Sequence, residues 1–136
     1  MSESGLKFWL VDAVEHQKLH PSTFELPDEQ NRGSVKEGEW AKLIFAFPTE
    51  PAHTFERMWV KIIAVGPTWY GGTLDNIPKT SGYVTIGDKF RFEPRHIISI
   101  WPPRHYTGPL LLRPPEEELN QISEPTSGLT PGRGSP

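Results

Sequence analysis

The stretch ERMWVKIIAV, residues 56–65, decides the fold because it is the longest run with the alternation of a β-strand. Successive side chains of a strand point to opposite faces of a sheet. One face of this strand is wholly apolar and predicts a core contact; it carries Met58, Val60, Ile62 and Ala64. The other face carries Arg57, Trp59, Lys61 and Ile63. An exposed tryptophan between two cations predicts a contact surface on that side.

The remaining chain divides into a domain and a tail. A length of 136 residues suffices for one domain with its own core. Strand-like segments end at Trp101, so we expect a single globular domain over residues 1–101. Residues 102–136 are rich in Pro, Gly, Ser, Thr and Glu, which predicts a mostly disordered tail. Within it, residues 110–112 and 113–118 are candidates for docking, with a solvated tail as the alternative.

Charge and cysteine content exclude several classes of protein. The formal net charge of -3 argues against a protein held to nucleic acid by its overall charge. The absence of cysteine excludes a disulfide scaffold, a thiolate metal site and a cysteine nucleophile. The start of the chain lacks the pattern of a secretory signal, and no apolar run has the length of a membrane span. We therefore expect a cytoplasmic location and no membrane partner.

Shorter strand-like runs surround the central one and are separated by Gly, Pro, Asn and Asp. They cover residues 6–14, 40–47, 69–74, 89–92 and 96–101, and the first of them is alternatively a short helix. This pattern predicts a mainly β fold, a small curled antiparallel sheet or SH3-like half-barrel with a possible short N-terminal helix. An α+β domain is the alternative.

Five ordered blocks of the sequence carry a family resemblance. They are TFELP (23–27), KLIF (42–45), ERMWVK (56–61), GTLDNIP (72–78) and GDKFRFEPRHI (87–97). Together they resemble a family of small bacterial or prophage domains of unknown function, some of which are similar to immunity proteins that neutralise toxins. The resemblance brings no catalytic residues with it. The tail lies outside it.

The candidate binding residues are aromatic, cationic or turn-forming. Trp and Tyr beside Arg and Lys are typical of protein interfaces and of sites for planar anions. An ordinary packing role remains open for Trp59, under Trp9 or Trp101. The candidates are Arg57, Trp59, Lys61, Trp69, Tyr70, Asp75 and Asn76.

Other possible signals favour ordinary structural explanations. Gly71-Gly72 indicates a bend or a close backbone approach more than a phosphate loop. His16 and His20 have the spacing of a helical metal pair, but we expect the segment before Pro21 to be too short for a stable helix, and it offers no third ligand. No nucleophile elbow or catalytic triad is present in the sequence, so we expect no catalytic residues, no metal and no cofactor.

These observations favour a non-catalytic binding protein that neutralises a partner protein, a toxin or effector, as an immunity protein or inhibitor does. The first alternative is a phage-type sponge that sequesters a nucleotide signal by stacking its base. The second is an SH3-like nucleic-acid-binding module.

Overall fold

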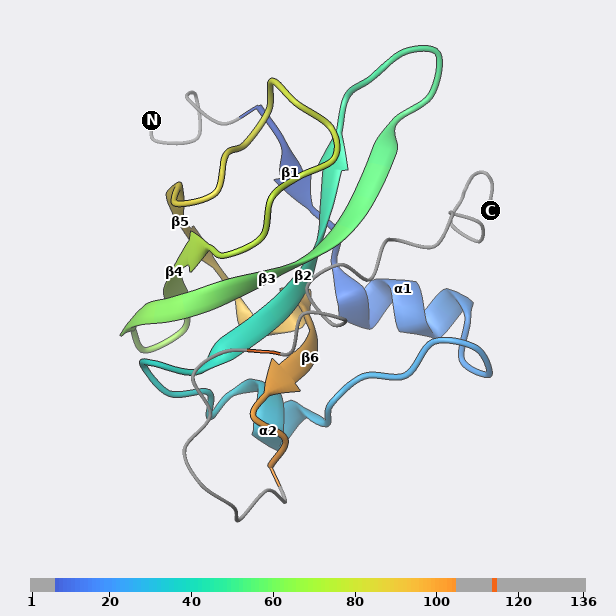
Figure 1. The fold of residues 1–136 in the computed structure, drawn as a ribbon. Helices are drawn as coiled ribbons and strands as arrows, with labels where there is room; N and C mark the ends of the chain where they lie inside the picture. Colours follow the sequence, from blue (N-terminus) through green and yellow to red (C-terminus); the bar gives the residue numbers. More distant parts are fainter. Residues whose placement is uncertain (1–6, 105–113, 115–136) are drawn as a thin grey trace.

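The computed structural model describes residues 7–104 and residue 114, and they form one curled antiparallel sheet with two short helices (Figure 1). Its elements in chain order are β1 (Trp9–Leu10), α1 (Ala13–Leu19), α2 (Glu29–Arg32), β2 (Trp40–Phe47), β3 (Thr54–Val65), β4 (Tyr70–Leu74), β5 (Lys89–Phe92), the 3-10 helix η2 (Pro94–His96) and β6 (Ile97–Trp101). The predicted mainly β half-barrel is confirmed.

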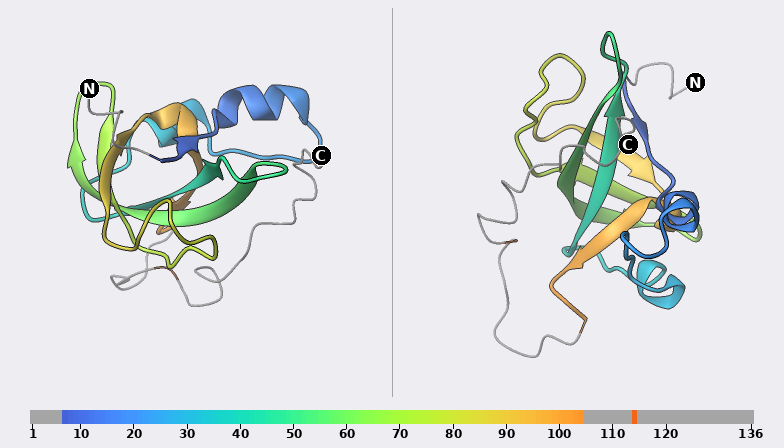
Figure 2. Two further views of the ribbon diagram at one scale, coloured as in Figure 1. Left: turned by 90° about the horizontal axis from the view of Figure 1, so that it is seen from above. Right: turned by 90° about the vertical axis from the view of Figure 1, so that its right-hand side faces the viewer.

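Strand β2 lies at the centre of the sheet. β3 pairs along one of its edges, and β4 and β5 follow in order on that side. The other edge of β2 is shared, because β1 pairs with Phe45 and Ala46 while β6 pairs with the stretch from Trp40 to Leu43. The chain leaves β5 through η2 and returns to β2 as β6, which curls the sheet toward closure (Figure 2).

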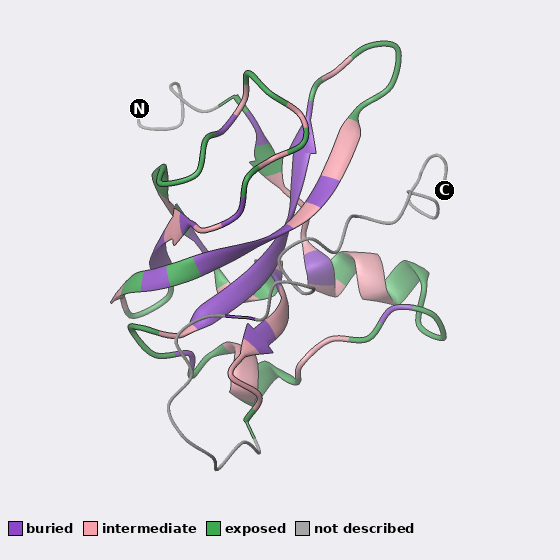
Figure 3. Cartoon of the chain, viewed as in Figure 1, coloured by how far each residue is buried: buried purple, intermediate pink, exposed green. Residues whose placement is uncertain are grey.

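The concave face of the sheet holds the main core. Leu43, Phe45 and Phe47 of β2 meet Met58, Val60 and Ile62 of β3 there, and all six are buried. A second, smaller apolar cluster lies on the opposite face of β2, where Ile44 packs with Ala13 and Phe24. Both faces of β2 are therefore covered, and every residue of β2 is buried (Figure 3).

One predicted core position is wrong because β3 is not regular to its end. The register between β3 and β4 shifts between Ile62 and Ala64. A bulge adds a residue to one strand and so reverses the alternation beyond it. Ala64 consequently pairs with Gly71 and lies outside the core cluster that holds Ile62.

The paired glycines of β4 serve packing. A β-carbon at Gly72 would lie 2.2 Å from Cγ1 of Val60, so only glycine allows β4 to approach β3 at this point. The interpretation of Gly71-Gly72 as a close backbone approach is confirmed.

The N-terminal segment departs from the predicted strand over residues 6–14. Only Trp9 and Leu10 pair with β2, and a helix begins at Ala13. Asp12 caps this helix, because its side chain accepts hydrogen bonds from the backbone nitrogens of Val14 and Glu15. The short helix that is the alternative for this region is therefore present. It extends to Leu19, so the expectation that the segment before Pro21 is too short for a helix is wrong.

Candidate functional site

The structure separates the predicted site residues into buried and exposed groups. Trp59 is 1% exposed, so the expectation of an exposed tryptophan on β3 is wrong. Its ring meets Trp101 edge to face at 6.5 Å between centroids, and the Lys42 ammonium lies 5.0 Å from its centroid. The packing role against Trp101 is the correct interpretation of Trp59.

Arg57 also lies away from the predicted surface, with its guanidinium 5.8 Å from the centroid of Phe24. Phe24 belongs to the small apolar cluster beneath α1. Arg57 and Trp59 therefore line a covered part of the sheet. Neither side chain forms an open contact surface.

Three more of the predicted residues hold the fold together. Asn76 accepts a hydrogen bond from the backbone nitrogen of Trp59 at 2.6 Å, and Asp75 accepts one from Nε1 of Trp40 at 2.8 Å. Tyr70 is buried, and its hydroxyl donates to the carbonyl of Arg32 at 2.7 Å. Burial raises the pKa of Tyr70, which keeps that donor protonated. These bonds of Asp75 and Asn76 join distant parts of the chain, which the expected turn role does not describe.

Lys61 and Trp69 lie on an open face with two cations that sequence reasoning missed. Residues paired across strands share a face of the sheet. Lys61 pairs with Thr73, and Thr73 pairs with Lys89. In the next row, Ala64 pairs with Gly71, and Gly71 pairs with Arg91. We call the surface formed by Lys61, Trp69, Thr73, Lys89 and Arg91 the cationic face.

The aromatic centre of the cationic face is held rigidly. The Arg91 guanidinium lies 4.0 Å from the centroid of the Trp69 ring, a cation–π geometry. A β-carbon at Gly66 would fall 2.1 Å from Cε2 of Trp69, so the indole rests directly against the Gly66 backbone. The ring is therefore fixed from two directions, with the charge of Arg91 presented above it.

The cationic face is open to solvent. Lys61, Lys89 and Arg91 are exposed, and Ile63, which lies beside them at the bulge of β3, is 37% exposed. Helices α1 and α2 contact η2, and α1 lies on the opposite side of the molecule from β4 and β5 (Figure 1). The face thus combines three cations, a half-buried indole and one exposed aliphatic side chain with the small residues Ala64 and Gly71 between them.

The sequence does contain a signal for Lys89 and Arg91, the two cations that the predicted site lacks. The alternation of Lys89-Phe90-Arg91-Phe92 predicts that the phenylalanines point inward and that Lys89 and Arg91 point outward. Their position beside Lys61 follows from the order β3–β4–β5, which alternation alone does not reveal.

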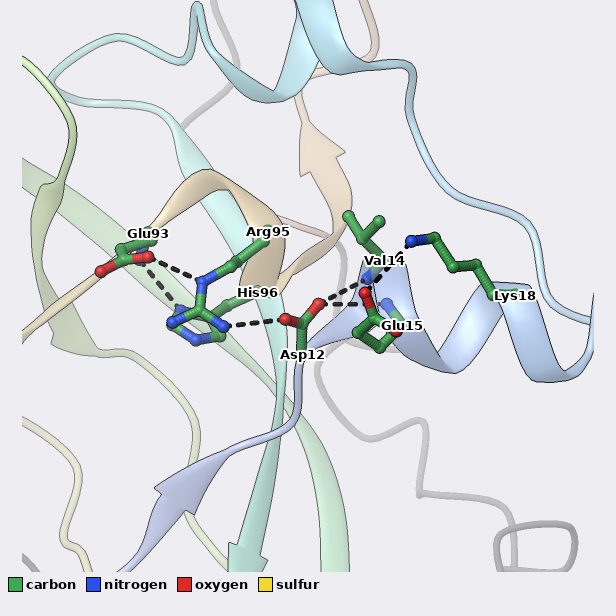
Figure 4. Close-up of polar contacts among 7 residues, drawn as sticks. All are labelled: Asp12, Val14, Glu15, Lys18, Glu93, Arg95 and His96. Carbon is green, nitrogen blue, oxygen red and sulfur yellow. Dashed lines mark hydrogen bonds and ion pairs between the residues drawn. The ribbon is translucent and has the colours of Figure 1, made fainter.

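A second polar site is a cleft with a volume of 450 Å³ between α1, α2 and η2. Its centre is Arg95, whose Nη1 lies 2.8 Å from Oδ2 of Asp12 and whose Nε lies 2.7 Å from Oε1 of Glu93 (Figure 4). The cleft is lined by Asp12, Val14, Glu15, Glu29, Arg32, Glu93, Pro94 and Arg95.

The carboxylates of this cleft are unsuited to proton transfer near neutral pH. Burial alone would raise the pKa of Asp12, but hydrogen bonds from Glu15 N and from Arg95 outweigh it and lower that pKa. The hydrogen bond from Arg95 lowers the pKa of Glu93 as well. Both acids are thus ionised, and Arg95 bridges them. The arrangement fastens the start of α1 to η2.

His96 is fixed as a neutral structural residue. Its Nδ1 accepts a hydrogen bond from the backbone nitrogen of Glu93 at 3.0 Å, which places the ring proton of the neutral form on Nε2. Burial is the main cause that lowers the pKa of His96, and the charge of Arg95 acts in the same direction. The imidazole therefore stabilises the turn into β6.

Searches of residues 7–104 and 114 for two other kinds of site give negative results. These residues include no group of three or more His, Asp or Glu side chains placed to hold a metal ion. None of the helices in this part of the chain has the length and apolar character needed to cross a membrane.

Comparisons of the chain with protein-family models, with curated proteins and with solved structures find no match. The resemblance to small bacterial and prophage domains therefore stays a prediction that depends on the five sequence blocks. The case for function depends on the geometry of the chain itself.

Proposed function

We propose that this chain is a non-catalytic binding protein of the inhibitor type, which covers an acidic surface of a partner protein with its cationic face. The observation that carries the proposal is the Arg91–Trp69 pair, which lies on the open face of the sheet beside the row that holds Lys61 and Lys89. The cysteine-free sequence favours the cytoplasm as the place of this encounter.

The composition of the cationic face suits recognition of a protein. Arginine and tryptophan supply a large share of the binding energy at protein interfaces. Exposed Ile63 adds apolar area next to the three cations. A partner surface with carboxylates around an apolar patch would complement this pattern, and its charge would accelerate association.

The fixed position of Trp69 supports a protein partner over a nucleotide. Base stacking requires a free aromatic ring face. Arg91 covers the Trp69 ring, and the indole also rests against Gly66. Trp59 and Tyr70, the other two aromatic candidates, are buried. The nucleotide sponge therefore lacks a ready stacking surface.

A photo-crosslinking residue at position 63, introduced into cells of the organism that encodes the chain, tests the proposal. We expect a discrete protein adduct that disappears when Arg91→Glu is added. The matched control places the same residue at position 19 in α1, where Leu19 is 75% exposed. Equal adducts from both positions, or adducts to nucleic acid alone, would overturn the proposal.

A further inference from the structure

The convex side of β2 and β3 carries a second aromatic surface, which is covered. It consists of Trp40 and Lys42 on β2, Trp59 on β3 and Trp101 on β6, and we call it the tryptophan platform. The strand register joins its members, because Trp40 pairs with Trp101 and Lys42 pairs with Trp59. It continues directly from the cationic face, since the Lys61 ammonium lies 5.3 Å from the centroid of Trp40.

The burial of this platform needs an explanation. Trp40 and Trp59 are 4% and 1% exposed, yet neither belongs to the core cluster or to the small cluster under α1. A large side chain on the outer face of a sheet is buried only if another part of the protein lies over it. Helix α1 covers the opposite end of this face, at Ile44.

Two polar atoms of the platform indicate the chemistry of its cover. Nε1 of Trp59 and Nε1 of Trp101 are both buried, and neither has a hydrogen-bond acceptor within the structure that residues 7–104 and 114 define. An indole N–H is a donor only, and a buried donor without an acceptor is costly. The part of the protein that lies over these indoles should therefore supply hydrogen-bond acceptors.

Pro114 is the other observation that needs an explanation. Its side chain is among those that are fully buried, although it lies ten positions beyond Arg104 in a proline-rich sequence. The chain reaches the edge of the platform before it, because Arg104 bonds to both carboxylate oxygens of Glu39 and to the carbonyl of Ser34. Glu39 immediately precedes Trp40. Ten residues span at most about 36 Å, which is ample to cross the face of two strands.

We propose that the segment around Pro114 docks on the tryptophan platform of its own chain and supplies acceptors to the buried indole nitrogens. Proline rings are apolar, and proline-rich segments have backbone carbonyls with few N–H donors. Such a segment matches a surface of three indoles with two unmatched donors. Aromatic surfaces recognise proline-rich segments in this general way.

Charge complementarity supports the same occupant. Glu116, Glu117 and Glu118 follow Pro114 by two to four positions in the sequence. Lys61, where the platform meets the cationic face, carries the opposite charge to this run of glutamates. A basic segment at this place in the tail would argue against docking there.

The test uses the full chain and does not depend on the proposed binding partner. In Pro114→Asp, nuclear magnetic resonance of ¹⁵N-labelled tryptophan should show shifted indole signals and faster hydrogen exchange for Trp59 and Trp101. The Trp9 indole, which is 43% exposed on β1, reports that the fold is intact. Pro131→Asp is the matched control in the same tail and should leave all five indoles unchanged. An unchanged Trp59 signal in Pro114→Asp overturns the proposal.

A second measurement identifies the chain that supplies the cover. The protein has no cysteine, so a spin label on Glu116→Cys is unique. It should broaden the indole signals of Trp59 and Trp101 in the molecule that carries it. Broadening seen only in unlabelled molecules mixed with labelled ones would mean a second copy provides the segment. It would contradict docking within one chain.

Discussion

At the scale of single residues, Trp59 shows how one strand position serves stability. Alternation correctly separates the side of β3 that holds Trp59 from the side that holds Val60. It does not tell whether that second side is open, because exposure depends on Trp101, Lys42 and whatever lies over them. The sequence therefore located Trp59 on the right face and left its burial undetermined.

Replacing this buried ring should be costly. Trp59→Ala should lower the free energy of unfolding by about 3–5 kcal/mol, the usual effect of deleting a buried aromatic side chain. Trp9→Ala is the control, since Trp9 is 43% exposed and its loss should cost about 1 kcal/mol or less. Urea denaturation followed by circular dichroism measures both. Equal costs would show that Trp59 is not sealed.

Two histidines should make stability depend on pH. Burial lowers the pKa of His16 and of His96 below the ordinary value near 6.5. The unfolded chain then binds more protons than the folded chain as pH falls through 6.5, so the folded state loses stability. Above pH 6.5 the full contribution of the two neutral histidines to stability is present. Asp12 and Glu93, whose pKa values are also lowered, should cause a further loss of stability as the pH falls below the ordinary pKa values of 3.8 and 4.5 for these side chains.

His96→Gln isolates the first of these effects. Glutamine can accept the hydrogen bond from Glu93 N but does not titrate. Urea midpoints at pH 7.5 and 5.5 should differ less in this variant than in the parent protein. A parent protein that is more stable at pH 5.5 would contradict the assignment of a neutral, buried His96.

At the scale of elements, alternation predicted most strands but favoured a strand where helix α1 begins, with the short helix as the alternative. The dense apolar run over residues 6–14 favoured a strand there. The missed signal is Asp12 followed three positions later by Glu15, a spacing found where helices begin. The bulge in β3 could not be predicted from the β3 sequence, because it arises from the pairing of β3 with β4.

The two glycines of β4 should differ in their tolerance of a side chain. Gly72→Ala would place a β-carbon 2.2 Å from Val60 and should cost about 1–3 kcal/mol of stability, as overpacked core substitutions do. Gly71→Ala places it 3.3 Å from Cβ of Ala64 on the outer face and should cost less. Thermal or urea unfolding of the two variants measures the difference, and an equal effect would contradict the assigned register.

At the scale of the whole molecule, the convex side of the sheet has a closed part and an open part. The closed part is the tryptophan platform, and the open part is the cationic face on β3, β4 and β5. Of the predicted site, Lys61 and Trp69 lie on the open part, while Arg57, Trp59 and Tyr70 do not. Strand order, which composition does not reveal, determines which residues form the open part.

The formal net charge of -3 hides this asymmetry. Three cations gathered on one face create a local field of opposite sign to the whole chain, and fields of this kind steer association. Sequence totals therefore cannot locate such a surface. The strand register does locate this surface, because it places Lys61 and Lys89 in one row across β4.

The central claim is that the cationic face binds an acidic partner protein. Its most direct test is calorimetry, in which the partner identified by crosslinking is purified and titrated with the parent protein and with two charge-reversal variants. Arg91→Glu should raise Kd about tenfold or more, since it inverts the charge at the centre of the contact. Lys18→Glu changes the net charge by the same amount on exposed α1 and should leave Kd unchanged. Equal affinities for the parent protein and Arg91→Glu would contradict the account.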